Sequence, residues 1–328
     1  MADDKRPMFD SFAKKAASMT PEELVFKHKG LLYPTLLCSL QTFQALEDTF
    51  RPRPDDAMLV AYPKCGFNWA MQLLNSMAAL INNDVKAHQD KVIPILEFGK
   101  PDKFKIMEES PGPRVYGTHL IYDDIPQSFF VNKTKMLVVF RNPKDTAVSY
   151  FHFYNKNPLL APFKSWDDFF PKFLSGEVLW GSYFDHAVLW NKHIDDPTVL
   201  LMTFEELKEV GTIFGPIPPT TSRVESTHSA SMEDMAAGIK KISEFLEYSL
   251  TEEQIQCVAE GGTFSAMQEK YKTANPDFGK ILLRKGEVGD WKNLFSEAQS
   301  KEIDAKFEQY LAGTALGNKL KYDVYCKF

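Results

Sequence analysis

The chain has 328 residues, of which 44% are hydrophobic and 25% are charged. These fractions are typical of a globular protein and exclude a disordered or fibrous chain. Lys and Arg number 38 and Asp and Glu 44, so the formal net charge of −6 argues against nucleic acid as the main partner. A small anion in a local basic site remains compatible with this charge.

Four short runs rich in Val, Leu, Tyr and Phe predict β-strands over 57–62, 114–118, 135–140 and 198–204. Apolar residues at three- and four-residue spacing predict helices over 68–81, 144–154, 166–174, 180–194, 236–246 and 296–310. This alternation predicts an α/β fold with a central parallel sheet flanked by helices. We expect a single domain over residues 1–328, with an atypical loop insertion at about 210–234, where Gly, Pro, Ser and Thr accumulate.

The cysteines are far apart and form no C-x-x-C pair, so neither a disulfide framework nor a zinc site is expected; they are Cys38, Cys65, Cys257 and Cys326. The first residues lack the apolar core of a signal peptide. The longest mostly apolar run, 69–81, is too short to span a bilayer. These features predict a cytoplasmic protein without a membrane partner.

The first predicted strand leads into Tyr-Pro-Lys-Cys-Gly-Phe-Asn-Trp at 62–69 and then into a helix. Ligands of doubly wound sheets bind beyond the carboxyl ends of the strands. The free N–H groups of a helix start and the ammonium of Lys64 favour an anion such as phosphate there. Because the lysine precedes the glycine, this is not a Walker loop. An ordinary turn with a solvated lysine is the alternative interpretation.

Two further basic segments follow. The third predicted strand leads into Arg-Asn-Pro-Lys-Asp at 141–145, and Ser149 lies eight residues after Arg141. The arginine fork and the hydroxyl suit a second phosphate, although a surface arginine and an ordinary helix serine are as plausible. Residues 283–292 place three cations and two glycines together, as in a phosphate-wrapping loop or a solvated loop. Three basic segments indicate one polyphosphorylated nucleotide.

Together these three segments resemble the cytosolic sulfotransferases, from about residue 34 to the carboxyl end and in the same order. The resemblance implies the P-loop-like sulfotransferase fold and 3′-phosphoadenosine 5′-phosphosulfate (PAPS) as the donor. The corresponding bisphosphate (PAP) would be the by-product, and no metal is implied. The acceptor would be a hydroxyl or amine on a small molecule.

Carried over by motif, the donor-binding residues are Lys64, Gly66, Phe67, Asn68, Trp69, Arg141, Ser149, Phe204, Thr263, Phe264, Met267, Arg284, Lys285 and Gly286. The resemblance implies that Lys64 neutralises the 5′-phosphosulfate and that Trp69 stacks on the adenine. It assigns the 3′-phosphate to Arg141, Ser149 and the 284–286 loop. His119, directly after the second predicted strand, resembles the family's catalytic base, because an imidazole can take a proton near neutral pH. A structural histidine is the alternative.

The sequence also departs from the family. The lysine that often stands two residues before the histidine is Gly117 here, and Phe67 and Asn68 replace two threonines. A non-catalytic or weakly active PAPS or PAP binder is therefore an alternative, as is, with less support, an ATP-type phosphotransferase. The family's dimer motif is altered at 292–301, so a homodimer is uncertain.

Aromatic residues are expected to line the acceptor pocket, which would suit a phenol, a steroid-like alcohol or an arylamine. The candidates for these pocket walls are Phe26, Tyr33, Phe43, Phe50, Phe98, Phe151 and Phe153.

Overall fold

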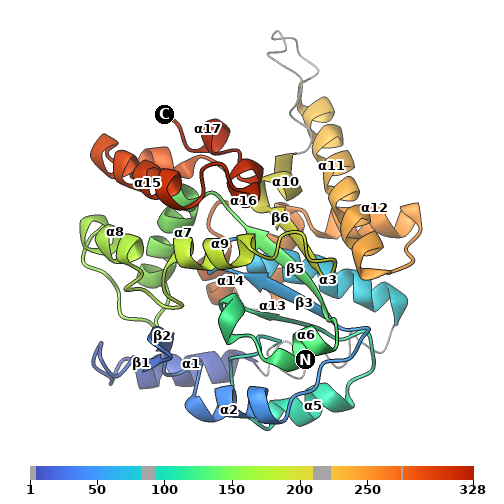
Figure 1. The fold of residues 1–328 in the computed structure, drawn as a ribbon, viewed down its shortest axis with the longest axis horizontal. Helices are drawn as coiled ribbons and strands as arrows, with labels where there is room; N and C mark the ends of the chain where they lie inside the picture. The colour runs from blue at the N-terminus through green and yellow to red at the C-terminus, as the bar shows by residue number, and fades with distance from the viewer. Residues whose placement is uncertain (1–4, 83–93, 210–222, 275) are drawn as a thin grey trace.

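The computed structural model describes residues 5–82, 94–209, 223–274 and 276–328. A four-stranded parallel sheet with the order β4-β3-β5-β6 lies at the centre (Figure 1). Its strands are β3 (Ala57–Ala61), β4 (Val115–Thr118), β5 (Lys135–Phe140) and β6 (Val199–Thr203). Each lies within one residue of its predicted bounds, and the α/β class with a central parallel sheet is confirmed.

The strand order determines where a ligand can bind. Every residue of β3 is buried, as expected for an apolar run in the middle of a parallel sheet. In the register, Leu59 of β3 lies opposite Gly117 of β4 on one side and Leu137 of β5 on the other. After β3 the chain forms β4 on one side of β3, and it then crosses over to form β5 on the other side of β3. Such a reversal opens a crevice at the carboxyl ends of β3 and β5.

Helices surround the sheet (Figure 1). Those before the sheet and between its strands are α1 (Lys5–Ala16), α2 (Leu40–Asp48), α3 (Phe67–Ile81), α5 (Lys103–Glu109), α6 (Gln127–Val131), α7 (Pro143–Lys156), α8 (Trp166–Ser175) and α9 (Tyr183–Asn191). Those after β6 are α10 (Phe204–Glu209), α11 (Arg223–Leu246), α12 (Glu252–Gly261), α13 (Phe264–Ala274), α14 (Pro276–Leu282), α15 (Glu297–Tyr310), α16 (Ala315–Lys319) and α17 (Tyr322–Tyr325). Short 3₁₀ turns occupy Tyr122–Asp124 and Asp290–Asn293. Within the described ranges, no helix combines the length and the apolarity that a bilayer span needs.

Two predicted boundaries are wrong. The helix predicted from residue 180 begins at Tyr183, because Trp180 and Gly181 have left-handed φ values of 59° and 75° and Ser182 caps the helix instead. Helix α11 begins at Arg223, so residues 223–234 of the predicted loop are helical. The remainder of that predicted loop, 210–222, lies outside the described residues.

A hairpin that the sequence patterns do not predict precedes the sheet. Strands β1 (Val25–His28) and β2 (Leu31–Pro34) pair antiparallel around Lys29 and Gly30. Both turn residues have positive φ, as a type I′ hairpin turn requires. The hairpin lies with α1 and α2 at the bottom of Figure 1, away from α15–α17 at the top.

Candidate functional site

The loop between β3 and α3 has the backbone of an anion cradle. Lys64 and Gly66 both have left-handed backbone conformations, with φ of 72° and 99°. Gly66 is the N-cap residue of α3 and has no side chain that could bond to the first N–H groups of the helix. A Cβ at Gly66 would lie 2.9 Å from Cδ2 of Phe204, so a side chain there would both strain the backbone and displace that ring. The first N–H groups of a helix have no intrahelical acceptors. They therefore remain available to an anion beside Lys64.

Lys64 is half-buried and lies near two other cations. Its Nζ is 4.4 Å from the ring centroid of Phe153. Burial, together with the positive charges of Arg141 and Arg284, lowers the pKa of Lys64 to about 7. The fold thus brings together one cation from each of the three basic segments. An anion with several charges would relieve this mutual repulsion.

Arg141 follows β5 and is held from both sides. Its Nη2 donates to the carbonyl of Glu287 at 2.7 Å and lies 3.7 Å from Oδ2 of Asp145. The guanidinium carbon is 4.5 Å from the ring centroid of Phe204. The Nε of Arg141 is buried without a hydrogen-bond acceptor, and so is the Nε of Arg284. Buried donors are rarely left unpaired, so both arginines fit an anionic ligand.

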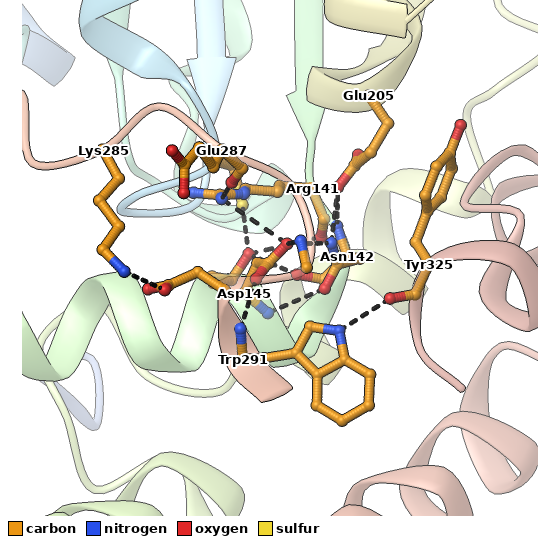
Figure 2. A network of polar contacts seen from close by, with 12 residues as sticks. Arg141, Asn142, Asp145, Glu205, Lys285, Glu287, Trp291 and Tyr325 are labelled. Atoms are coloured by element: carbon orange, nitrogen blue, oxygen red, sulfur yellow. Dashed lines mark hydrogen bonds and ion pairs between the residues drawn. The ribbon is translucent and has the colours of Figure 1, made fainter. Parts of the chain in front are cut away.

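Asp145 fixes the loop that carries Arg284 and Lys285. As Figure 2 shows, it accepts hydrogen bonds from the backbone N–H groups of Gly289 and Trp291, at 2.7 and 3.0 Å. Arg284 and Lys285 both pair with Asp290 at 2.5 Å. Burial would raise the pKa of Asp290, but the hydrogen bonds that it accepts outweigh burial and lower the pKa to about 2. The two cations are therefore presented from a loop anchored on the start of α7.

The residues predicted to contact adenine also come together. The rings of Trp69 and Phe204 are 5.2 Å apart, and the indole N–H of Trp69 donates to the carbonyl of Gly262 at 2.8 Å. Gly262 directly precedes the segment with Thr263, Phe264 and Met267. A Cβ at Gly286 would lie 2.6 Å from Cδ2 of Phe264, so the 284–286 loop touches the same segment. Ser149 and Asn68 are half-buried on α7 and α3.

His119 directly follows β4 and is 9% exposed. Its Nδ1 lies 2.7 Å from the carbonyl oxygen of Ala61, to which a protonated Nδ1 donates. In the neutral imidazole this tautomer leaves Nε2 as an acceptor. Burial lowers the pKa of His119, and the charge of Lys64 acts in the same direction. A neutral ring with an open Nε2 can act as a base.

Phe67 occupies the space in front of Gly117. A Cβ at Gly117 would lie 2.5 Å from Cζ of Phe67 and 2.8 Å from Cε of Met71. The ring of Phe67 also lies 4.5 Å from the ring of His119. The glycine at 117 and the phenylalanine at 67 are therefore linked by packing. The phenyl ring of Phe67 occupies the space that a side chain at position 117 would need.

Five of the seven residues predicted to line the acceptor pocket lie toward the site. Phe26, Tyr33 and Phe43 contact one another, Tyr33 contacts Trp180, and Trp180 contacts both Phe98 and His119. Phe153 lies beside Lys64. The other two make their ring contacts elsewhere. Phe50 packs against Phe104, Tyr116 and Phe129, and Phe151 packs against Trp166 and Phe169.

Glu97 and Trp180 are not among the predicted site residues, although both lie beside His119. Glu97 is fully buried and accepts hydrogen bonds from the His119 backbone and the Trp180 indole. A sequence signal exists for it, since a carboxylate within the apolar run Ile-Pro-Ile-Leu-Glu-Phe at 93–98 indicates a buried charge with partners.

Comparison with known proteins gives a consistent result. A family model described as Sulfotransferase domain matches residues 54–210 and 231–315. Sulfotransferase 6B1 of Mus musculus is 44% identical over 317 residues, which cover 97% of this chain and 96% of the relative, and that of Danio rerio is 45% identical over 95% and 97%. The solved mouse sulfotransferase SULT7A1 complexed with PAP is 29% identical with a TM-score of 0.72, covering 92% of this chain and 99% of its own.

Proposed function

Because the chain belongs to the sulfotransferase family, whose donor is PAPS and whose product is PAP, we propose how its residues carry out the transfer. His119 is the general base, Lys64 stabilises the leaving phosphate, and the acceptor is a hydroxyl or amine on a small aromatic or apolar molecule. The observation that carries this proposal is a buried His119 whose Nδ1 is engaged by the Ala61 carbonyl, beside Trp180 and in the field of Lys64, which itself lies near Arg141 and Arg284. A cytoplasmic location belongs to the same proposal.

The donor supplies a sulfuryl group attached to a good phosphate leaving group. In the proposed step the acceptor oxygen forms a bond to sulfur while the bond from sulfur to the phosphate oxygen breaks. His119 Nε2 takes the proton of the attacking hydroxyl. Lys64 and the first N–H groups of α3 stabilise the negative charge that grows on the phosphate. Atoms and charges balance without a further reactant.

Two separate groups hold the nucleotide in this proposal. The unpartnered Nε atoms of Arg141 and Arg284 support their assignment to the 3′-phosphate, together with Lys285, Gly286 and Ser149. Trp69, Phe204 and the segment with Thr263, Phe264 and Met267 offer aromatic and apolar faces to the adenine. The SULT7A1 complex with PAP supports a bisphosphate in this position.

The aromatic cluster beside His119 supports a flat acceptor. Phe98 and Trp180 lie next to the base, and the hairpin residues Phe26 and Tyr33 continue the cluster. The hydroxyl of Tyr33 is buried without a hydrogen-bond partner. A polar group on the acceptor would satisfy it. A phenol or a steroid-like alcohol fits this chemistry.

A weakly active nucleotide binder is the second candidate, favoured by the packing at Gly117. Because Phe67 fills that place, no cation there assists the sulfuryl group. The two candidates differ in turnover and not in nucleotide binding.

The test combines binding and transfer. His119→Ala should lower transfer of labelled sulfate to a panel of phenols by about 10³-fold or more, because it removes the proton acceptor. The variant should keep its thermal stabilisation by PAP, since His119 lies outside the proposed nucleotide contacts. ATP should stabilise the protein less than PAP does. Full activity of His119→Ala would refute the base, and wild-type stabilisation by PAP without transfer would favour the weakly active binder.

A further inference from the structure

A buried carboxylate lies behind His119. Glu97 belongs to the segment 94–99, which runs along the free edge of β4. The backbone N–H of Leu96 donates to the carbonyl of Gly117, and the N–H of Gly117 donates to the carbonyl of Pro94, each at 2.8 Å. The segment thus extends the sheet by a short parallel bridge and places Glu97 beside Thr118 and His119.

Three donors meet the carboxylate of Glu97. Its Oε1 accepts from the backbone N–H of His119 at 2.9 Å and from the indole N–H of Trp180 at 3.2 Å. Its Oε2 accepts from the hydroxyl of Thr118 at 2.8 Å. Burying a carboxylate costs several kcal/mol unless it is paired and hydrogen-bonded. One carboxylate therefore connects the end of β4, at Thr118 and His119, with the indole ring of Trp180.

Lys103 fixes the same segment from the other side. Its buried ammonium donates to the carbonyls of Ile95 at 2.5 Å and Leu96 at 2.8 Å, and also to that of Phe98. The backbone on both sides of Glu97 is therefore held. Phe98, whose ring centroid lies 6.3 Å from that of His119, is carried by this rigid segment.

We propose that Glu97 is a positioning residue for His119: it fixes the His119 backbone and the tryptophan packed against the imidazole, and it supplies a negative charge near the ring. This inference rests on the proposed role of His119 as the base. It deepens that role, because so deeply buried a base needs both a fixed ring and a charge that preserves its basicity.

The charges around His119 determine the sign of the effect. Lys64 approaches from the loop before α3, Glu97 from the 94–99 segment and His186 from α9. His186 has its pKa lowered to about 3 by burial and is neutral. Burial lowers the pKa of His119 and Lys64 adds to this, while Glu97 and the hydrogen bond to Ala61 oppose it. Removing the charge of Glu97 should therefore lower the pKa of His119 further.

The experiment is an NMR titration of labelled histidine in Glu97→Gln, with His119→Asn to identify the signal and with PAP present to stabilise the fold. The His119 titration midpoint should move to lower pH by about 0.5 unit or more. The acid limb of kcat/KM should move with it, and kcat at neutral pH should fall about tenfold. Glu97→Asp keeps the charge and should keep the midpoint near the wild-type value.

Thr118→Val is the matched control, because it removes one hydrogen bond to Glu97 and leaves the charge. It should lower kcat several-fold without moving the titration midpoint. An unchanged midpoint in Glu97→Gln would overturn the inference, and so would an unchanged kcat in both variants. If the midpoint moves while the acid limb does not, the coupling stands and the role of His119 as the base is refuted instead.

Discussion

Lys64 combines a left-handed backbone with a charge that its surroundings disfavour. Its pKa of about 7 means that, without a ligand, the ammonium loses its proton as the pH rises through neutrality. A phosphosulfate or bisphosphate beside it would raise that pKa again, because an opposite charge favours the charged form. Nucleotide binding and protonation of Lys64 are therefore linked.

We predict that PAP binding at pH 8 takes up close to one proton and that the uptake is smaller at pH 6, where Lys64 is already charged. At pH 8 the phosphates are fully ionised, with a second pKa of about 6, and do not contribute. Calorimetry in two buffers of different ionisation enthalpy measures the uptake. Lys64→Met should abolish it, and an unchanged uptake in this variant would assign the proton to another group.

Gly117 and Phe67 are a second example at the level of single residues, because their packing is coupled. We predict that Gly117→Ala destabilises the protein by about 1–3 kcal/mol, because the new methyl group overlaps the phenyl ring of Phe67. In a Phe67→Thr background the same change should cost much less. Urea unfolding of the four proteins gives the coupling energy. Additive effects would show that Phe67 moves freely and does not fill the place of the missing side chain.

The site residues show what a sequence can and cannot predict. Lys64, Arg141 and Arg284 are predictable because each follows a strand or lies in a glycine-containing basic loop, and the fold does bring them together. Glu97 is missed because its partners, Thr118 and Trp180, come from distant parts of the chain. The Phe67 and Gly117 contact is missed for the same reason, since two substitutions 50 positions apart look independent until the register of β3 and β4 is known.

At the scale of elements, the 284–291 loop depends on the start of α7. We predict that Asp145→Ala raises the dissociation constant for PAP by tenfold or more, because the loop loses its two backbone anchors at Gly289 and Trp291. Trypsin should also cleave faster after Arg284 or Lys285. Asp167→Ala removes an exposed carboxylate that accepts from Gln299 and is the matched control. Equal affinities in the two variants would contradict the proposed role of the loop.

The elements themselves were predictable to different degrees. Buried strands such as β3 stand out because both faces are apolar. The start of α9 does not stand out in the sequence. The helical spacing of apolar residues continues through Trp180 and Gly181, but their left-handed backbone prevents the helix from including them. The hairpin β1–β2 is hidden by strands of only four residues, of which β1 is merely half-buried.

For the whole molecule, one segment after α10 lies outside the match to the family model. The family model matches on both sides of residues 211–230 but not across them. We predict that deletion of residues 212–220 leaves PAP binding intact and shifts the melting temperature by a few degrees at most, since the sequence predicts a loop there and the free energy of loop closure depends weakly on length. Differential scanning calorimetry with and without PAP measures both. A deletion variant that cannot fold would contradict the prediction of a tolerated insertion.

The assembly of the protein stays a prediction. In the segment 292–301, where the sequence predicts an altered dimer motif, Ser296 and Gln299 form a capping box that starts α15. Starting α15 is therefore a sufficient structural role for Ser296 and Gln299, and it does not require a second copy of the chain.

The positions of two tryptophans give this protein a built-in optical readout. Trp69 lies against Phe204 at the proposed nucleotide site, while Trp180 lies against His119 and Tyr33 at the proposed acceptor site. Because indole emission responds to its immediate surroundings, single-tryptophan versions of the enzyme would report the arrival of each substrate separately. The order in which donor and acceptor enter could then be followed in real time without an added dye.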